Sequence, residues 1–297
     1  AVMITEPNQI AYHLEKAMYL ATNGRGGPVW LDVPLDVQGA MVDTDELVHF
    51  NEAECSNEIP PKVSNDDINK IIEHIKASKK PVIIAGTGIR LSGAHSDFLK
   101  LVDKLKIPVV TPWNGHDVLS NDNEYFCGRP GNMGTRGGNF VVQNCDLLIS
   151  LGCRLSIRQV TYNYKEFAPN AYKIMVDIDK AELKKPTLSL DLPIHADVKD
   201  VIDQLLKSGF DNENLEHKKW LKWCRDIDKK YPACLPEYYK KKTPVNPYAF
   251  IDTLFKELPE NETVVCGNGS ACVVSFQGAI IKKGQRLFTN SGCASMG

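Results

Sequence analysis

The stretch KPVIIAGTG, residues 80–88, decides the fold class of this chain. It is a short run of aliphatic residues that stops at a Gly-Thr-Gly turn, and a helical pattern over 93–105 follows it. Continuous apolar runs of this length are typical of strands buried on both faces of a parallel sheet. A strand, a glycine turn and a helix in this order form the repeating unit of an α/β fold.

The same unit recurs on both sides of this stretch. Further strands are predicted at 107–115, 146–152 and 172–179, and helices at 66–77, at 136–144 and after IHADV (194–198). Strands that alternate with helices at this spacing favour a parallel sheet covered by helices on both faces. We therefore predict a doubly wound parallel-sheet domain over 63–208.

Parts of two further α/β domains flank this central one. Before it, a helix over 7–22 and a strand over 28–33 form the first piece, 1–40, and an acidic, proline-containing linker covers 41–62. After it, a lysine- and tryptophan-rich stretch, 209–243, is expected to form an exposed helix and connector. The last piece, 244–297, starts a new unit with a helix and the strand 263–266.

Composition excludes several classes of protein. Of the 297 residues 43% are hydrophobic, which is enough to bury a large core. Lys and Arg total 35 against 37 Asp and Glu, so no basic field points to nucleic acid or to an anionic membrane. No window reaches the roughly 18 apolar residues of a spanning helix, and no secretory leader is recognisable. We expect a cytoplasmic protein.

Cysteines and histidines give no metal or disulfide pattern. The nine cysteines are odd in number and scattered, without a C-x-x-C pair, and the seven histidines are isolated. We therefore predict no metal ligands in this segment and name no catalytic residue. The chain opens in the middle of a helical pattern and closes on TNSGCASMG (289–297), so we expect a piece of a longer protein.

Glycine and polar residues follow four predicted strands, at the edge where open parallel sheets bind ligands. Glycines let a pyrophosphate approach backbone N–H groups, arginines meet phosphate oxygens, and acids at strand ends accept ribose hydroxyls. Glycine in a plain strand-to-helix turn is the competing interpretation at each position. The candidates for a nucleotide site are Gly86, Thr87, Gly88, Thr111, Trp113, Asn114, Gly152, Arg154, Arg158, Asp177 and Asp179.

A second candidate lies in TVVCGNGSAC, residues 263–272. Its apolar run stops at Gly267-Asn268-Gly269-Ser270 and then resumes with a helical pattern. The start of a helix offers free N–H groups to an anion, and this turn adds two polar side chains. A tight corner without a ligand is an equally open interpretation.

Several segments resemble, in colinear order, the thiamine-diphosphate enzymes of the acetolactate synthase and pyruvate oxidase group. ATNGRGGPVWLDVPLDVQ (21–38) is similar to the end of their pyrimidine-binding domain. KKPVIIAGTGIR, IPVVTPWNG, CDLLISLGCRL, YKIMVDIDKAEL and IHADV resemble their central domain. TVVCGNGSACVVSFQ and LFTNSGCASMG resemble the start of their diphosphate-binding domain. The resemblance covers nearly the whole chain.

The resemblance implies roles for individual residues. Gly267, Asn268, Gly269, Ser270, Ser295 and Met296 match positions that contact or support thiamine diphosphate. It implies FAD or another nucleotide in the central domain, bound through the eleven candidates above together with Glu182, Asp197 and Val198. It also places the activating glutamate before residue 1 and the Mg²⁺ motif after residue 297, so we expect the piece alone to be inactive.

The resemblance implies a transferase that decarboxylates a pyruvate-like 2-oxo acid and joins the enamine to a second carbonyl, as a homodimer or homotetramer. Met133, Ser156 and Ile157 stand where acetolactate synthases usually have a histidine and two aspartates. These departures leave open a related 2-oxo acid decarboxylase or oxidase. For the piece alone, an inactive nucleotide-binding module is the third alternative.

Overall fold

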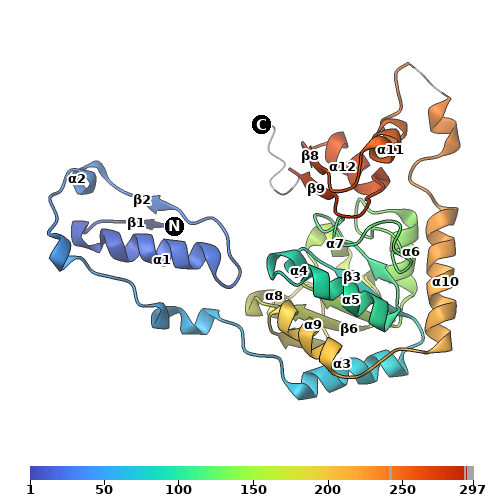
Figure 1. The fold of residues 1–297 in the computed structure, drawn as a ribbon, viewed down its shortest axis with the longest axis horizontal. Helices are drawn as coiled ribbons and strands as arrows, with labels where there is room; N and C mark the ends of the chain where they lie inside the picture. Colours follow the sequence, from blue (N-terminus) through green and yellow to red (C-terminus); the bar gives the residue numbers. More distant parts are fainter. Residues whose placement is uncertain (241–242, 291, 293–297) are drawn as a thin grey trace. The chain divides into compact units, whose positions relative to one another are not determined.

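The computed structural model describes residues 1–240, 243–290 and 292 (Figure 1). The chain divides into two compact units, Ala1–Pro61 and Lys62–Gly297. Each unit is built from local α/β pieces and is described here by itself. The finer domain boundaries at 40, 208 and 243 stay predictions.

A five-stranded parallel sheet with the order β4-β3-β5-β6-β7 forms the centre of the larger unit. After β3 the chain steps outward to β4 and then returns to the other side of β3, so the direction of winding reverses between β3 and β5. This confirms the predicted doubly wound parallel sheet. The strands are β3 (Pro81–Ala85), β4 (Val109–Val110), β5 (Leu147–Leu151), β6 (Tyr172–Asp177) and β7 (Leu192–His195).

Alternate residues of these strands point into two separate cores, as the two-residue period of a strand requires. Ile83 and Ile149 pair across β3 and β5 and face the first core, and Val82 and Leu148 pair beside them and face the second. Helices α3 (Asn65–Ala77), α5 (His95–Leu105) and α9 (Val198–Lys207) supply the first core, and α6 (Arg136–Asn144) and α10 (Leu215–Lys230) supply the second.

Short elements lie between the main helices and strands. The strand predicted over 107–115 is only two residues long, because Pro112 has no N–H for a ladder and the chain turns away at Thr111. Strand β7 was not predicted, since its four residues give too short a pattern. The remaining short helices are α4 (Gly88–Leu91), α7 (Ile157–Val160) and α8 (Lys180–Lys184).

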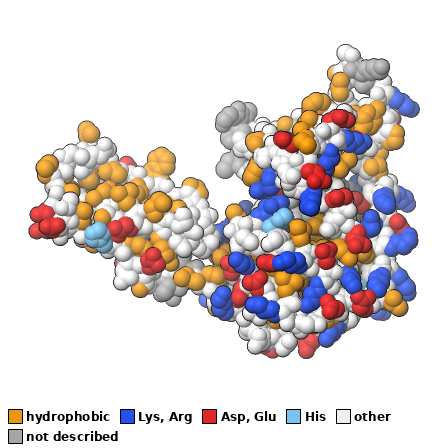
Figure 2. Space-filling view, in the orientation of Figure 1, with side chains coloured by type: hydrophobic (Ala, Val, Ile, Leu, Met, Phe, Trp, Pro, Cys, Tyr) orange, Lys and Arg blue, Asp and Glu red, His pale blue; other side chains and the backbone are white. Residues whose placement is uncertain are grey.

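Helix α10 was expected to be an exposed connector, and that expectation is wrong for one of its faces. Trp220 and Cys224 are buried in the second core, and the indole N–H of Trp220 donates to the carbonyl oxygen of Pro81 at 3.0 Å. The lysines of α10 are exposed on the outer face, where Figure 2 shows lysine and arginine side chains along the helix. The helix is therefore an integral layer of the central domain.

Four further elements complete the larger unit: α11 (Pro247–Glu257), β8 (Thr263–Cys266), α12 (Ser270–Gly278) and β9 (Arg286–Thr289). Strands β8 and β9 pair in parallel, and their own small core includes Phe255 and Leu287. The amide oxygen of Asn246 caps α11 by accepting from the N–H of Tyr248 at 2.8 Å. Strand β8 has the bounds predicted from sequence.

The smaller unit holds α1 (Ile10–Thr22), α2 (Leu35–Gln38) and the two-stranded parallel sheet of β1 (Val2–Met3) and β2 (Leu31–Asp32). Ile4 is fully buried, but α1 buries none of its residues, and Met18 stays 66% exposed. Figure 2 shows hydrophobic side chains over much of this unit's surface. Within the described residues, this unit therefore leaves an apolar surface uncovered.

Candidate functional site

Gly86, Gly88 and Gly152 lie after β3 and β5, where the direction of winding of the sheet reverses. A Cβ atom on Gly86 would lie 2.2 Å from the carbonyl oxygen of Gly152, and one on Gly88 would lie 2.8 Å from the Cα of Gly152. The N–H of Gly86 donates to Leu151 and the N–H of Gly88 donates to Gly152, at 2.9 and 3.0 Å. These glycines are required because two backbones meet, whichever ligand binds beside them, and Thr87 between them is exposed.

Three predicted site residues, Thr111, Trp113 and Asn114, follow β4 at the carboxyl edge of the sheet. Thr111 is fully buried, and its hydroxyl oxygen has no hydrogen-bond partner among the described residues. The ring of Trp113 packs on Phe276 of α12, with the ring centroids 4.6 Å apart. Asn114 has a left-handed backbone, with φ of 66°, and its amide oxygen accepts from the Thr289 hydroxyl at 2.9 Å. This part of the edge therefore reaches the C-terminal elements.

The predicted arginines divide between two places. The guanidinium of Arg158 lies 5.4 Å from the ring centre of Trp113, and Gln159 beside it is buried with both polar side-chain atoms unpartnered among the described residues. Arg154 instead forms an ion pair with Glu182 at 3.1 Å. Burial raises the pKa of Glu182, but hydrogen bonds from Arg154 and Lys185 outweigh it and leave that pKa lowered.

The predicted acidic residues have local structural partners. Asp177 accepts from the N–H of Asp179 at 2.9 Å, and Asp179 caps α8 through the N–H of Ala181 at 2.8 Å. Asp197 caps α9 through the N–H of Lys199, and Val198 is the first, buried residue of that helix. Asp179 and Asp197 therefore have capping roles that need no ligand.

The turn Gly267–Ser270 joins the end of β8 to the start of α12. Gly269 has φ of 65°, and a Cβ atom on Gly267 or Gly269 would meet no atom of the described residues within 4 Å. The first N–H groups of a helix have no acceptor in their own ladder, and the positive end of the helix dipole lies there. An exposed turn of this kind has room for an anion. The other two predicted residues, Ser295 and Met296, lie outside the described residues.

A junction of buried charges, which sequence reasoning missed, joins the central sheet to β9. Asp117 is 5% exposed, and its carboxylate accepts from Arg286 Nε at 2.7 Å and from the N–H of Leu287 at 3.0 Å. Arg90 Nε lies 3.3 Å from the same carboxylate. His116 Nε2 donates to the carbonyl oxygen of Leu287 at 2.8 Å. The only sequence signal was the pair His116-Asp117, and nothing in its spacing indicated these partners.

Burial lowers the pKa of His116 to about 4, and the positive charge of Arg129 adds to this effect. A neutral imidazole is consistent with its surroundings, because Arg129 and Arg286 lie near it and its buried Nδ1 has no hydrogen-bond partner among the described residues. His116 is therefore a structural residue at neutral pH. In the described part of the chain, no group of three His, Cys, Asp or Glu residues could hold a metal ion.

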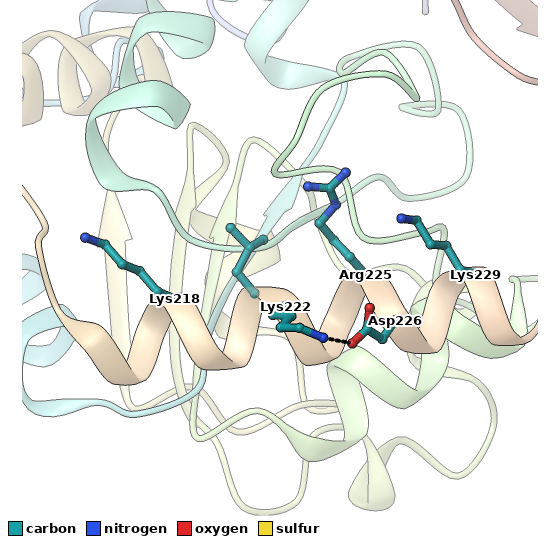
Figure 3. Close-up of a pocket in the computed structure, with 6 residues that line it drawn as sticks. Lys218, Lys222, Arg225, Asp226 and Lys229 are labelled. Atoms are coloured by element: carbon teal, nitrogen blue, oxygen red, sulfur yellow. Dashed lines mark hydrogen bonds and ion pairs between the residues drawn. The ribbon is translucent and has the colours of Figure 1, made fainter.

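A basic groove of about 330 Å³ runs along the outer face of α10 (Figure 3). Lys222 in it is paired with Asp226 at 2.5 Å, and Lys218 is paired with Glu213 at 3.0 Å. Exposed ion pairs of this kind contribute little free energy and are common on solvated helix faces. The groove is lined by Lys218, Leu221, Lys222, Arg225, Asp226 and Lys229, none of which belongs to the candidate sites.

A family model and the sequences of known proteins point to the same group of enzymes. Residues 68–205 match the family described as "Thiamine pyrophosphate enzyme, central domain". The chain is 34% identical to a protein named "Probable acetolactate synthase large subunit" from Methanocaldococcus jannaschii, over 86% of this chain and 43% of that protein.

No helix among the described residues is long and apolar enough to cross a membrane.

Two other relatives extend the match. The chain is 34% identical to the acetolactate synthase large subunit of Porphyra purpurea, over 84% of this chain and 42% of that protein. It is 28% identical to acetolactate synthase isozyme 1 large subunit of Escherichia coli, over 100% of this chain and 52% of that protein. The chain thus spans about half the length of the curated relatives it matches.

Proposed function

This chain belongs to the thiamine pyrophosphate enzymes of the acetolactate synthase group, and on that premise we propose that the whole protein is a carboligase. In this proposal it decarboxylates a pyruvate-like 2-oxo acid and joins the remaining unit to a second carbonyl compound. The observation that carries the proposal is the exposed turn Gly267–Ser270 at the start of α12, within a colinear match to such enzymes.

We assign the turn Gly267–Ser270 to the diphosphate of thiamine diphosphate. Backbone N–H groups at the start of α12 would donate to the phosphate oxygens, and the side chains of Asn268 and Ser270 would add polar contacts. The cofactor supplies the electron sink that loss of CO₂ from a 2-oxo acid requires. Mg²⁺ belongs to the same proposal, as the ion that neutralises the diphosphate. This chain's part is to bind and orient the cofactor.

We also propose FAD as the ligand of the central domain. The buried hydroxyl of Thr111 and the buried amide of Gln159 have no partner among the described residues, which fits a ligand with hydrogen-bonding groups at this edge. The ring of Trp113 and the guanidinium of Arg158 lie beside them and suit an aromatic, phosphorylated molecule. Cytoplasmic location and a homodimeric or homotetrameric assembly complete the proposal.

The full-length protein, supplied with thiamine diphosphate, Mg²⁺, FAD and pyruvate, tests the activity. We expect acetolactate and CO₂ as the products. Aldehyde or peroxide without acetolactate would replace the carboligase by the related decarboxylase or oxidase, which the residues Met133, Ser156 and Ile157 leave open. A purified protein without flavin absorbance that does not take up added FAD would reject the flavin.

A further inference from the structure

The side chain of Arg129 is buried where the central domain meets the end of α12. It is 2% exposed, although an arginine is rarely buried without strong compensation. One terminal nitrogen, Nη1, donates to the carbonyl oxygens of Phe276 and Ala279, at 3.2 and 2.9 Å. The other, Nη2, donates to the amide oxygen of Asn121 at 2.7 Å. The guanidinium thus binds the last turn of α12 directly.

These contacts lie at the end of α12 opposite the candidate diphosphate turn. The last carbonyl groups of a helix have no partner in its own ladder, and the negative end of the helix dipole lies there. A cation that donates to them stabilises the helix end and offsets the negative pole. Arg129 at one end and an anion at Gly267–Ser270 at the other therefore favour the same helix.

Other hydrogen bonds near Arg129 also join the central domain to the carboxyl end of α12 and the residues after it. The amide oxygen of Asn121 accepts from Arg129 and also from the N–H of Ile281 at 2.8 Å, while the N–H of Asn121 donates to the carbonyl oxygen of Ile281 at 2.8 Å. Gln277 Nε2 in the last turn of α12 donates to the carbonyl oxygen of Met133 at 2.9 Å. The carboxyl end of α12 is therefore held on several sides.

The loop that carries Arg129 is itself closely packed. The N–H of Thr135 donates to the carbonyl oxygen of Arg129 at 2.7 Å, and the N–H of Arg129 donates to the Thr135 hydroxyl at 3.2 Å. A Cβ atom on Gly138 would lie 2.5 Å from the backbone nitrogen of Arg129, and one on Gly128 would lie 2.8 Å from Asp228 Oδ1. This packing fixes the backbone of Arg129 and brings a carboxylate near its charge.

Burial lowers the pKa of Arg129 to about 10, and the nearby charges of Asp228 and Asp117 oppose this effect. The guanidinium therefore stays protonated at neutral pH. A charged donor to two helix carbonyls forms hydrogen bonds about twice as strong as neutral ones. Among the described residues no carboxylate lies within 4 Å of it, so its main partners are these carbonyls.

We propose that Arg129 is a positioning residue, which holds α12 so that the turn Gly267–Ser270 presents its N–H groups to the diphosphate. The ligand in this statement rests on the proposed function. Because α12 is a rigid nine-residue helix, fixing its carboxyl end against the central domain fixes the direction of its amino end. Arg129 itself touches no part of the ligand site.

Thiamine diphosphate binding and hydrogen exchange of α12 together test this role, in the full-length protein. Arg129→Met removes the charge and all donors, and Arg129→Lys keeps the charge with one donor group. Asp117→Asn is the matched control, because it removes a buried charge at the same junction, and the Asp117 carboxylate bonds β9 instead of α12. Calorimetry with thiamine diphosphate and Mg²⁺ gives the dissociation constant, and circular dichroism verifies folding.

We expect Arg129→Met to raise the dissociation constant about tenfold or more, because binding must then order α12 without its charged hydrogen bonds to Arg129. Arg129→Lys should show a smaller rise. Backbone amides of α12 exchange faster in Arg129→Met and stay protected in Asp117→Asn. Wild-type affinity in a folded Arg129→Met protein overturns the proposal, as does an equal loss in Asp117→Asn. A wild-type protein that binds no thiamine diphosphate rejects the proposed function, and the exchange of α12 then decides the role of Arg129.

Discussion

Single residues at the edge of the sheet show how one residue type serves two purposes. Gly86 and Gly152 are glycines because two backbones touch, whereas Gly267 and Gly269 face open space. The sequence pattern of a strand followed by glycine is the same in both places. Only the distances between neighbouring backbones separate a packing glycine from one that leaves room for a ligand.

Replacing Gly86 by alanine is expected to destabilise the protein. The new Cβ would lie 2.2 Å from the carbonyl oxygen of Gly152 and 2.5 Å from the Cα of Cys153, so backbone must shift. Overpacking of this kind typically costs about 1–3 kcal/mol in the free energy of unfolding. Urea denaturation measures the loss, and Gly267→Ala, which meets no atom within 4 Å, is the control. Equal stability of the two variants would contradict this account.

His116 makes stability depend on pH below neutrality. Its pKa is about 4 in the folded protein against 6.5 in an exposed histidine, because burial and Arg129 disfavour the charged form. Between these values the unfolded chain binds a proton that the folded chain does not, so stability is lost as pH falls from 6.5 toward 4. The full loss is on the order of 3 kcal/mol.

Denaturation from pH 7.5 to 4.5 measures this dependence, and His116→Gln is the variant to compare. Glutamine retains a donor for the carbonyl of Leu287 and cannot be protonated in this range. The variant should therefore lose less stability on acidification than the wild type. His95 and His217, whose pKa values burial also lowers, supply a residual slope in both proteins. Identical pH slopes would exclude His116 as the cause.

Whole elements were predicted well where their hydrophobic period was long. The apolar spacing of 66–77 and of 136–144 predicted α3 and α6 to within one residue, because an amphipathic helix needs its apolar residues on one face. Helix α10 was predicted to be exposed because lysines surround its tryptophans. In the structure Trp220 is 6% exposed and Trp223 is 37% exposed, so one face of the helix is core and the other is solvated.

The first residue of α12 gives a direct test of anion binding by a helix start. Proline is tolerated at the first position of a helix and lacks an N–H. Ser270→Pro should therefore preserve the fold and remove both the backbone donor and the hydroxyl, whereas Ser270→Ala keeps the backbone donor and loses only the hydroxyl. We expect a rise of about tenfold in the dissociation constant for thiamine diphosphate with proline, measured by calorimetry. An equal loss with alanine and with proline would assign binding to the hydroxyl instead.

At the scale of the whole molecule the chain consists of two units with separate interiors. Limited digestion with a glutamate-specific protease should cut first in the exposed stretch 43–54, which contains Glu46, Glu52 and Glu54. The expected stable product begins directly after one of these glutamates and contains the whole larger unit, because few contacts protect an exposed connecting segment. Mass spectrometry identifies the product. Early cleavage inside α10, at Glu216, would contradict the division into these two units.

The sequence by itself determined the α/β class, the alternation of strands and helices, and the family to which the central domain belongs. Apolar period and strand-to-turn order are local properties, and they remain legible without the rest of the molecule. It also indicated where to search for ligands, since the carboxyl ends of parallel strands meet at one edge. The cofactor residues named from resemblance remain predictions at this stage.

Only the tertiary structure decided which partners each of these residues contacts. Arg129 lies far in sequence from its partner Ala279, as Asp117 does from Arg286, and both contacts depend on how the C-terminal elements pack on the central sheet. Asp179 and Asp197, whose role at a nucleotide stays a prediction, cap helices α8 and α9. Hydrogen bonds and charge pairs act over a few ångströms, so their partners are set by the packing of distant segments rather than by local spacing.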